Sequence, residues 1–195
     1  MTHVYADTMF TQSVKAEQEA YGSLQNNEKL RTDFGPNDAL GKREIDFISK
    51  RDSFYLATVS ETYWPYVQHR GGPRGFLAVV NPRQLAYADF RGNTQLISVG
   101  NLRRNGRCSL ILMDYAHRRR LKLLGHIRVL DIKEVPQSTL ALLDMPEYRA
   151  DVERVFIIDL VAFDWNRPQH ITRRYSADEL NELMPLLNFI EHARE

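Results

Sequence analysis

Short apolar runs separated by polar turns fill the middle of the chain, and this pattern predicts an antiparallel β protein. Strands are expected at residues 54–60, 65–70, 76–80, 84–89, 107–115, 120–131 and 155–165. Gly125 interrupts the sixth run, which predicts either a bulge or a close backbone approach there. Because six or seven strands with few crossover helices do not suit a doubly wound sheet, the pattern favours an antiparallel barrel.

Helical patterns lie on both sides of these strands. The expected helices cover about 11–21, closed by Gly22, then about 42–50, and then 134–152 in two pieces divided near Met145-Pro146. The polar segment 23–42 contains Gly35-Pro36 and is expected to form a loop or a long connection. Residues 94–101 fit more than one structure, but a helix beginning just after Gly92-Asn93 would aim free backbone N–H groups at an anion.

The last helix is expected to open at Ser176, which forms a capping box with Glu179 three residues later. Pro185 predicts a kink or a division within this helix. The buried face of the helix is expected to contain Leu180, Leu183, Leu187 and Ile190.

The length of 195 residues is enough for one sizeable hydrophobic core. We therefore expect a single domain over 1–195, with an N-terminal helical extension over about 1–50 and a C-terminal helix over about 176–195. The 43% hydrophobic and 26% charged residues are typical of a soluble globular protein.

The charge balance limits the classes of partner. With 26 basic and 25 acidic residues the net charge is +1, which argues against nucleic acid or anionic lipid as the main partner. The apolar runs fall short of the ~20 residues of a membrane span, and the N-terminus lacks the pattern of a signal peptide. The expected location is the cytoplasm, with no membrane partner.

The single cysteine and the histidines do not predict a reactive or metal site. Cys108 lies in the apolar run CSLILM and is expected to be a small buried side chain, because nothing nearby in the sequence would lower its pKa. His69 and His126 lie on separate predicted strands without the spacing of metal ligands, so no metal is expected.

Polar residues gather where three of the apolar runs end. The groups are Gln68-His69-Arg70-Gly71-Gly72, then Arg91-Gly92-Asn93, then Ser98 and Asn101. Glycines let a ligand approach the backbone, and arginines make bidentate contacts to phosphate, so the pattern suits a planar ligand that carries a phosphate. Ordinary turns between strands would explain the same residues.

Several motifs in order resemble the flavin-nucleotide-binding relatives of pyridoxamine 5′-phosphate oxidase. They are FTQSVKAEQEAYGS, HRGGPRGFL, ADFRGN, SVGNL and DWNRPQHITRRY, and they extend roughly from Phe10 to Tyr175. The resemblance implies a mainly β fold, the FMN-binding split β-barrel, with antiparallel strands and N- and C-terminal helices. It also implies a homodimer with one FMN in each of two clefts at the subunit interface.

The resemblance also implies roles for individual residues. It places two strands at the flavin ring. The strand that runs beneath the ring contains Gln68, His69, Arg70 and Gly71, and the strand paired with it contains Ala88 and Asp89. The phosphate is assigned to the turn Arg91, Gly92 and Asn93, completed by Ser98 and Asn101. The other subunit is expected to supply Arg120 and Lys122, and the residues that close over the ring are Trp165 and Arg174, with His170 between them as a candidate titrating group.

The substrate does not follow from the resemblance. Pyridoxamine phosphate oxidases proper end with a basic motif that holds the substrate phosphate, whereas this chain has PQHITRRY followed by a further helix. The flavin site itself has plausible donors, since Arg70, Arg91 and Asn93 can bind phosphate and Lys122 or Arg174 can place a positive charge near the ring.

Three functions fit these observations. The first is an FMN-dependent oxidoreductase that acts on a small, planar substrate, with redox chemistry supplied by the flavin. The alternative is a non-catalytic FMN-binding module that stores the cofactor or senses redox state. A third is a nucleic-acid binder that uses Arg103, Arg104, Arg107 and the run 118–120, and the near-zero net charge argues against it.

Overall fold

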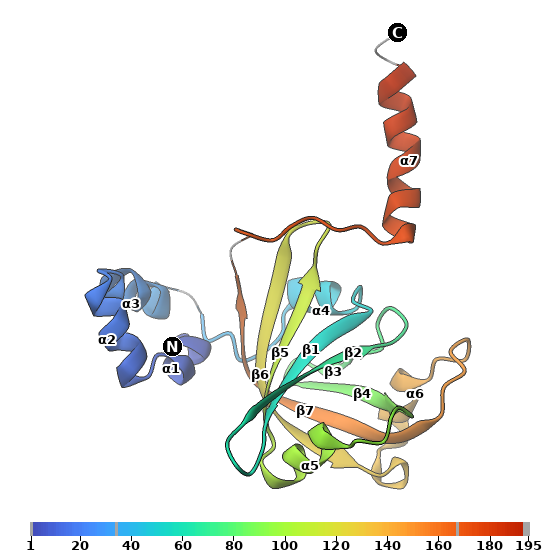
Figure 1. The fold of residues 1–195 in the computed structure, drawn as a ribbon, viewed down its shortest axis with the longest axis horizontal. Helices are drawn as coiled ribbons and strands as arrows, with labels where there is room; N and C mark the ends of the chain where they lie inside the picture. Colours follow the sequence, from blue (N-terminus) through green and yellow to red (C-terminus); the bar gives the residue numbers. More distant parts are fainter. Residues whose placement is uncertain (1, 34, 167, 193–195) are drawn as a thin grey trace.

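A computed structural model describes residues 2–33, 35–166 and 168–192 and contains a seven-stranded antiparallel sheet (Figure 1). The strands lie in the order β2-β1-β5-β6-β7-β4-β3. Their bounds are β1 Ser53–Val59, β2 Pro65–Gly71, β3 Ala78–Asn81, β4 Gln84–Phe90, β5 Arg107–Asp114, β6 Arg119–Leu130 and β7 Val152–Trp165. Within the described residues the two edge strands do not pair, so the curved sheet is an open, split barrel, as the sequence predicts.

The core lies inside the curve of the sheet, where alternate strand residues point inward. On β1 this alternation buries Phe54, Leu56 and Thr58. Tyr87 of β4 lies at the centre, with its ring stacked on Phe156 at 4.8 Å and edge-on to Phe54 at 5.2 Å. The aromatic cluster therefore joins both halves of the sheet.

Gly125 produces the predicted irregularity in β6. The register between β6 and β7 shifts between Leu124 and Gly125, because Leu124 pairs with Ala162 while Gly125 pairs with Leu160. A Cβ atom at Gly125 would lie 2.9 Å from the carbonyl oxygen of Asp159. Both predicted features, the bulge and the close backbone approach, are confirmed.

Cys108 is buried, as the sequence predicts, with its thiol donating to the carbonyl oxygen of Gly125 at 3.3 Å. Burial raises the pKa of the Cys108 thiol to about 12. At neutral pH the side chain is therefore a neutral thiol, and it behaves as a small hydrophobic residue.

Most of the predicted helices are present. They are α2 Gln12–Ala20, α4 Lys42–Ile48, α5 Ile97–Arg104, α6 Gln137–Leu143 and α7 Ala177–His192. Gly22 has a φ of +67° just after α2 and ends that helix as predicted. The capping box of α7 is also confirmed, because the Glu179 side chain accepts from the backbone N–H of Ser176 at 2.8 Å and Ser176 Oγ accepts from the backbone N–H of Glu179 at 3.2 Å.

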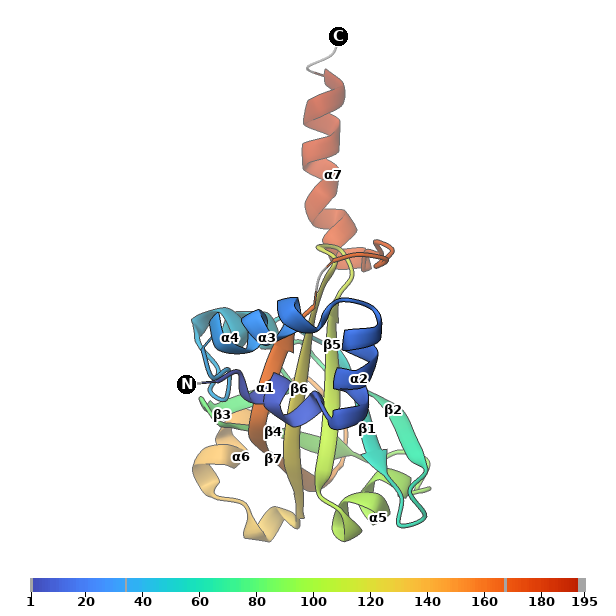
Figure 2. The ribbon, with the colours of Figure 1, turned by 90° about the vertical axis from the view of Figure 1, so that its left-hand side faces the viewer.

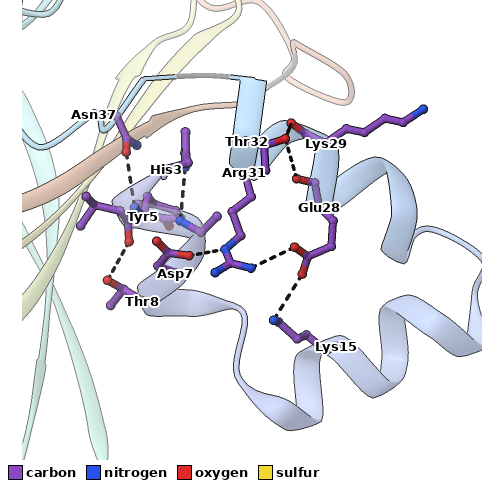
Figure 3. Close-up of polar contacts among 12 residues, drawn as sticks. His3, Tyr5, Asp7, Thr8, Lys15, Glu28, Lys29, Arg31, Thr32 and Asn37 are labelled. Carbon is purple, nitrogen blue, oxygen red and sulfur yellow. Dashed lines mark hydrogen bonds and ion pairs between the residues drawn. The ribbon is translucent and has the colours of Figure 1, made fainter. Parts of the chain in front are cut away.

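The predicted loop over 23–42 is wrong in its first half, where α3 (Leu24–Asp33) forms, and a further helix, α1 (Val4–Met9), precedes it. Helix α3 lacks an apolar stripe, so periodicity does not reveal it. Charged contacts join it to its neighbours, because Arg31 pairs with Asp7 of α1 and with Glu28, and Glu28 pairs with Lys15 of α2 (Figure 3).

Two other helix predictions need correction. The second predicted piece of 134–152 is a turn at Pro146 and Glu147 followed by irregular chain, and β7 already begins at Val152 because it pairs with β4 at Phe90. Helix α7 continues through Pro185, so it is not divided there. It extends away from the barrel (Figure 1), which leaves Leu180 exposed; the side chains of Leu187 and Ile190 lie outside the described residues.

The N-terminal helices lie beside the barrel (Figure 2), and α1 is the one that contacts β7. The segment that follows them binds β7 by its backbone, since the N–H of Phe163 donates to the carbonyl oxygen of Asn37 at 2.9 Å. The Asn37 side chain in turn accepts from the backbone N–H of Tyr5 at 3.4 Å. Asn37 therefore attaches α1 to the outside of the sheet.

Candidate functional site

A cleft of about 240 Å³ opens between β2, β4 and the N-terminus of α5. It brings together several residues that the sequence assigns to the cofactor. Those that line it are Gln68, Arg70, Asp89, Gly92, Asn93 and Ser98. Residues from three separate segments of the chain therefore meet in one place.

Strand β2 points alternate side chains into the cleft. Tyr66, Gln68 and Arg70 share this face, whereas His69 points to the other side and packs against Tyr55, with ring centroids 5.6 Å apart. Gln68 also fixes the helix opposite, because its side-chain oxygen accepts from Ser98 Oγ at 2.8 Å. This bond holds β2 and α5 on either side of the cleft.

Arg70 and Asp89 form a largely buried ion pair across the cleft floor. Arg70 Nη1 donates to Asp89 Oδ1 at 2.6 Å, and the two side chains are 16% and 7% exposed. Arg154 of β7 approaches the second carboxylate oxygen at 3.5 Å. Burial raises the pKa of Asp89 above its usual range, and the charge of Arg70 opposes that rise.

The guanidinium of Arg70 has donor capacity left. It lies over the ring of Phe156, at 5.3 Å from the centroid. Its Nε is buried and has no acceptor among the described residues. A buried donor without a partner carries a free-energy cost.

Helix α5 begins at the cleft, so a helix does start after Gly92-Asn93. Its N-cap is Leu96, with a φ of 54°, and within residues 35–166 no side chain caps the helix. The N–H groups of the first turn have no acceptor inside the helix. Ile97, Ser98 and Val99 all line the cleft, so these donors and the positive end of the helix dipole lie at its wall.

The turn before α5 is only partly directed into the cleft. A Cβ at Gly92 would come no closer than 4.0 Å to another heavy atom, the carbonyl oxygen of Phe90, so the space above it is open. Asn93 accepts from the backbone N–H of Gln95 at 3.2 Å. Arg91 is exposed outside the cleft, with Nε 4.0 Å from Glu153.

Other predicted residues lie next to the cleft and support its walls. Asn101 is buried and donates to Thr58 Oγ1 at 3.0 Å, which fastens α5 to β1. Ala88 is buried on β4, on the face of the strand opposite Tyr87 and Asp89, and Gly71 ends β2.

Arg120, Lys122, Trp165 and Arg174 lie away from this cleft in the single protomer. Two strands, β1 and β5, separate β2 from β6, which carries the first two. Lys122 pairs with Asp164 at 2.8 Å. The indole of Trp165 donates to Glu44 at 2.7 Å, and the guanidinium of Arg174 lies 5.2 Å from the ring of Tyr115. His170 is exposed, with a φ of 61°.

Residues 42–156, more than half of the chain, match the family model described as pyridoxamine 5′-phosphate oxidase. The chain belongs to this family. No curated protein matches the sequence.

Solved structures of low identity share the fold of this pyridoxamine 5′-phosphate oxidase family member. A protein from Lactobacillus delbrueckii, provisionally assigned as a pyridoxamine 5′-phosphate oxidase, is 19% identical with a TM-score of 0.51 over 65% of this chain and 94% of that chain. HupZ from Group A Streptococcus is 14% identical with a TM-score of 0.52 over 70% of this chain and 99% of that chain. These likenesses concern the fold, and they agree with the open barrel.

Sequence reasoning missed several side chains at the cleft of this family member. Tyr66 could have been found from strand alternation, because it lies two residues before Gln68 on β2. Arg154 could not, since it approaches Asp89 only through the register between β4 and β7, which pairs these two residues. Glu153, which also lines the cleft, depends on the same register.

Proposed function

We propose that this member of the pyridoxamine 5′-phosphate oxidase family binds FMN as a homodimer and acts as a flavin-dependent oxidoreductase on a small substrate. The observation that carries the proposal is the uncapped N-terminus of α5, which opens onto the same cleft as Gln68 and Arg70. A helix N-terminus beside an arginine is a favourable site for a phosphate group.

The donors of the cleft suit the FMN phosphate. Arg70 lines the cleft with its cationic side chain, and the first turn of α5 offers backbone N–H groups. The two carboxylates that line the cleft are already engaged, because Asp89 pairs with Arg70 and Glu153 pairs with Arg154 at 2.5 Å. Their negative charge is therefore largely offset, and the open space at Gly92 leaves room for the phosphate.

One protomer supplies only part of a flavin site. The cleft of about 240 Å³ is smaller than the roughly 300–1,000 Å³ of sites that enclose a small molecule. The ring would therefore extend beyond the cleft and need a second wall. We propose that the partner subunit provides it with Arg120, Lys122, Trp165 and Arg174.

The outer face of β1, β2 and β5 is the surface that we propose for the dimer. Tyr55, Val67 and Ile111 are 42%, 61% and 38% exposed. Tyr55 lies opposite Ile111 in the register of β1 and β5, and Ala57 lies opposite Val67 in that of β1 and β2. An exposed apolar patch on adjacent strands is typical of a protein interface.

The roles of the residues follow from their chemistry. When bound, FMN supplies hydride or electron transfer. Arg70 and the α5 N-terminus would hold the phosphate, while Gln68 keeps β2 and α5 at a fixed separation. The cationic side chains of Lys122 and Arg174 would stabilise negative charge near the ring. Turnover distinguishes this oxidoreductase from the alternative function, a module that stores FMN or senses redox state without catalysis.

FMN titration of the purified protein tests the cofactor. Wild type is expected to bind FMN more tightly than riboflavin, because only FMN carries the phosphate. Gly92→Asp places a carboxylate in the open space and is expected to weaken FMN binding at least about tenfold by charge repulsion. Quenching of flavin fluorescence during titration measures the affinity of each protein for FMN and for riboflavin.

Gly92→Ala is the matched control, since its Cβ meets open space and adds no charge. Absence of FMN uptake, or equal FMN affinity of the Asp and Ala variants, contradicts the cofactor proposal. Steady-state oxidation of a reduced nicotinamide or amine donor by the FMN-loaded protein supports the oxidoreductase, whereas tight FMN without any turnover supports the storage or sensing module.

Ile111→Lys tests the dimer. The charge would be buried in the proposed interface, so we expect at least a tenfold weaker dimer and weaker FMN binding. Sedimentation velocity over a range of concentrations measures the dimer. Leu142→Lys on α6, another exposed apolar residue at 49%, is expected to leave it unchanged. A monomeric wild type, or an Ile111→Lys variant that dimerises normally, rejects this interface.

A further inference from the structure

Helix α7 leaves its own barrel and carries an exposed apolar face. Both views show it projecting past the end of the sheet, and among the described residues no other helix or strand packs extensively against it (Figure 1 and Figure 2). Leu180, Leu183 and Met184 lie at positions i, i+3 and i+4, so they share one side of the helix. Leu180 and Met184 are 48% and 51% exposed. Within one protomer this face has no extensive cover among the described residues.

A helix of this kind needs a surface to pack on. Isolated helices shorter than about 12–15 residues are marginal in water, and most helical stability in proteins comes from packing of an amphipathic face. Helix α7 has 16 residues, only slightly more, and Pro185 contributes no backbone N–H to it. Asp178 and Glu182 lie on the side opposite the apolar face. The pattern is that of a helix with one face on protein and the other in water.

The chain just before α7 determines which surface the helix reaches. In the proposed dimer, Arg174 of one subunit lies at the FMN cleft of the other, and α7 begins at Ala177, three residues later. Because three extended residues span at most about 10–11 Å, α7 begins close to that cleft. This step rests on the proposed function, and it directs the helix to the other subunit.

Helix α5 runs from the FMN cleft toward the β1–β2 hairpin. Near its start, Ser98 donates to Gln68 at 2.8 Å, and further along, Asn101 donates to Thr58 at 3.0 Å. Thr58 pairs with Tyr66, which is two residues closer to the hairpin turn than Gln68. The last turn of α5 is therefore its nearest part to the hairpin, in agreement with the view in Figure 1.

Exposed apolar side chains lie at both ends of α5. Leu96 and Ile97 are exposed at the FMN cleft. Trp64 is 76% exposed at the hairpin. The backbone N–H of Ser60 donates to the carbonyl oxygen of Trp64 at 2.9 Å and continues the β1–β2 ladder, so Trp64 shares the strand face of Tyr66. Exposed apolar groups that line one surface are typical of a protein interface.

Charge favours contact between the same two helices. Asp178, Glu179 and Glu182 make the first part of α7 acidic. Helix α5 ends with Arg103 and Arg104, which are both exposed. Surfaces of opposite charge attract each other before they touch, so this charge steers α7 toward α5.

We propose that α7 of each protomer packs its apolar face along α5 of the partner subunit, between the FMN cleft and the β1–β2 hairpin. A helix of 16 residues is about 24 Å long and one of 8 residues about 12 Å, so α7 reaches both ends of α5. Its apolar side chains then cover the partner's Ile97 and the partner's Trp64. The exchange of helices gives each FMN cleft an outer wall from the other subunit.

Cross-linking of the purified protein tests this position of α7. Glu61→Cys in the hairpin turn and Asn181→Cys on α7 place exposed thiols beside the proposed contact and keep its apolar side chains. Cys108 does not react, because burial raises the pKa of its thiol to about 12. The hairpin and α7 lie at opposite ends of one protomer (Figure 1), so a link between them joins two subunits. A short bifunctional maleimide is expected to give covalent dimers on a denaturing gel.

Three further variants of the double-cysteine protein serve as test and controls. Leu180→Lys puts a charge into the apolar contact and is expected to slow cross-linking at least about tenfold. Glu182→Gln changes the charge by the same amount on the opposite side of α7, and we expect a rate within about twofold of the parent. Leu142→Cys on α6, in place of Asn181→Cys, is expected to give no link and controls for random collision. All of these positions are exposed, and unchanged thermal melting confirms folding.

Sedimentation velocity of the same samples separates this inference from the proposed dimer. A dimer that gives no link between hairpin and α7 overturns the position of the helix and leaves the dimer intact. A link within one chain, or a rate of cross-linking that Leu180→Lys does not change, also overturns it. A protein that sediments only as a monomer rejects the dimer and the helix exchange together.

Discussion

Arg70→Met is expected to destabilise the protein by about 3 kcal/mol at pH 7, because it leaves a buried carboxylate with less compensation. Asp89 is 7% exposed at its side chain and accepts from Arg70 at 2.6 Å. After the substitution only Arg154, at 3.5 Å, remains beside it. Methionine keeps much of the apolar contact that the arginine stem and guanidinium make with Phe156, so the loss reports mainly on charge.

This loss is expected to depend on pH in a defined direction. Burial already raises the pKa of Asp89, and the charge of Arg70 is the largest effect that opposes the rise. Removal of Arg70 raises this pKa further above its unfolded value of about 3.9. The folded state then binds more protons than the unfolded state, so the stability of the variant falls as pH increases from about 4 through the folded pKa.

Urea unfolding at pH 4 and pH 7 measures this dependence, with the larger difference from wild type expected at pH 7. The double variant Arg70→Met/Asp89→Asn removes the charge as well and is expected to recover part of the lost stability. Arg83→Met is the surface control, since Arg83 is 65% exposed in its pair with Asp38 and should cost under about 1 kcal/mol. The account is contradicted if Arg70→Met lowers the free energy of unfolding equally at both pH values, or if Arg83→Met lowers it as much as Arg70→Met does.

The strands were predictable because their signal is local. Alternation along β1 and β2 follows from the two-residue period of a strand facing one core, so each strand can be recognised within its own run of residues. The start of β7 was not predictable in this way. Val152 joins the strand because it pairs with Phe90 of β4, and that pairing depends on residues 62 positions away in the sequence (152 − 90 = 62).

Helix α3 is a second element that could not be predicted from its own residues. Its residues present no apolar face, and Asn26, Asn27, Thr32 and Asp33 are weak helix formers, so the pattern resembles a polar loop. Arg31 contacts Asp7 of α1, and Glu28 contacts Lys15 of α2 (Figure 3). Contacts of this kind depend on how the three helices fold back on each other, which periodicity does not encode.

Some features of the candidate site could be predicted from the sequence and others could not. Gln68, Arg70 and Ser98 were predictable, because polar residues at strand ends and a resemblance in motif order both mark them. The pairing of Arg70 with Asp89 was not, because it requires β2 and β4 to face each other across the cleft. Lys122 and Arg174 would reach the cleft only through a second subunit, so their role depends on the proposed dimer.

Gly125→Val is expected to destabilise the protein by about 3 kcal/mol and to lower its melting temperature by roughly 6–12 °C. A Cβ at this position would lie 2.9 Å from the carbonyl oxygen of Asp159 and 2.9 Å from Cγ2 of Ile158. The first of these atoms is backbone, so it cannot rotate away. Either β6 or β7 must shift at the bulge, and the tightly packed core on both strands would lose contacts.

Gly100→Ala is the control for this prediction, because it also adds a side chain to a glycine, at a position in α5 where the added Cβ has space. Among the described residues no heavy atom outside its own helix lies within 4 Å of the added Cβ, so we expect a gain of about 0.5–1 kcal/mol from higher helix propensity. Calorimetric melting of both variants is therefore expected to give shifts of opposite sign. A Gly125→Val variant that melts like wild type would mean that β6 and β7 are further apart at Gly125 than the 2.9 Å contact indicates.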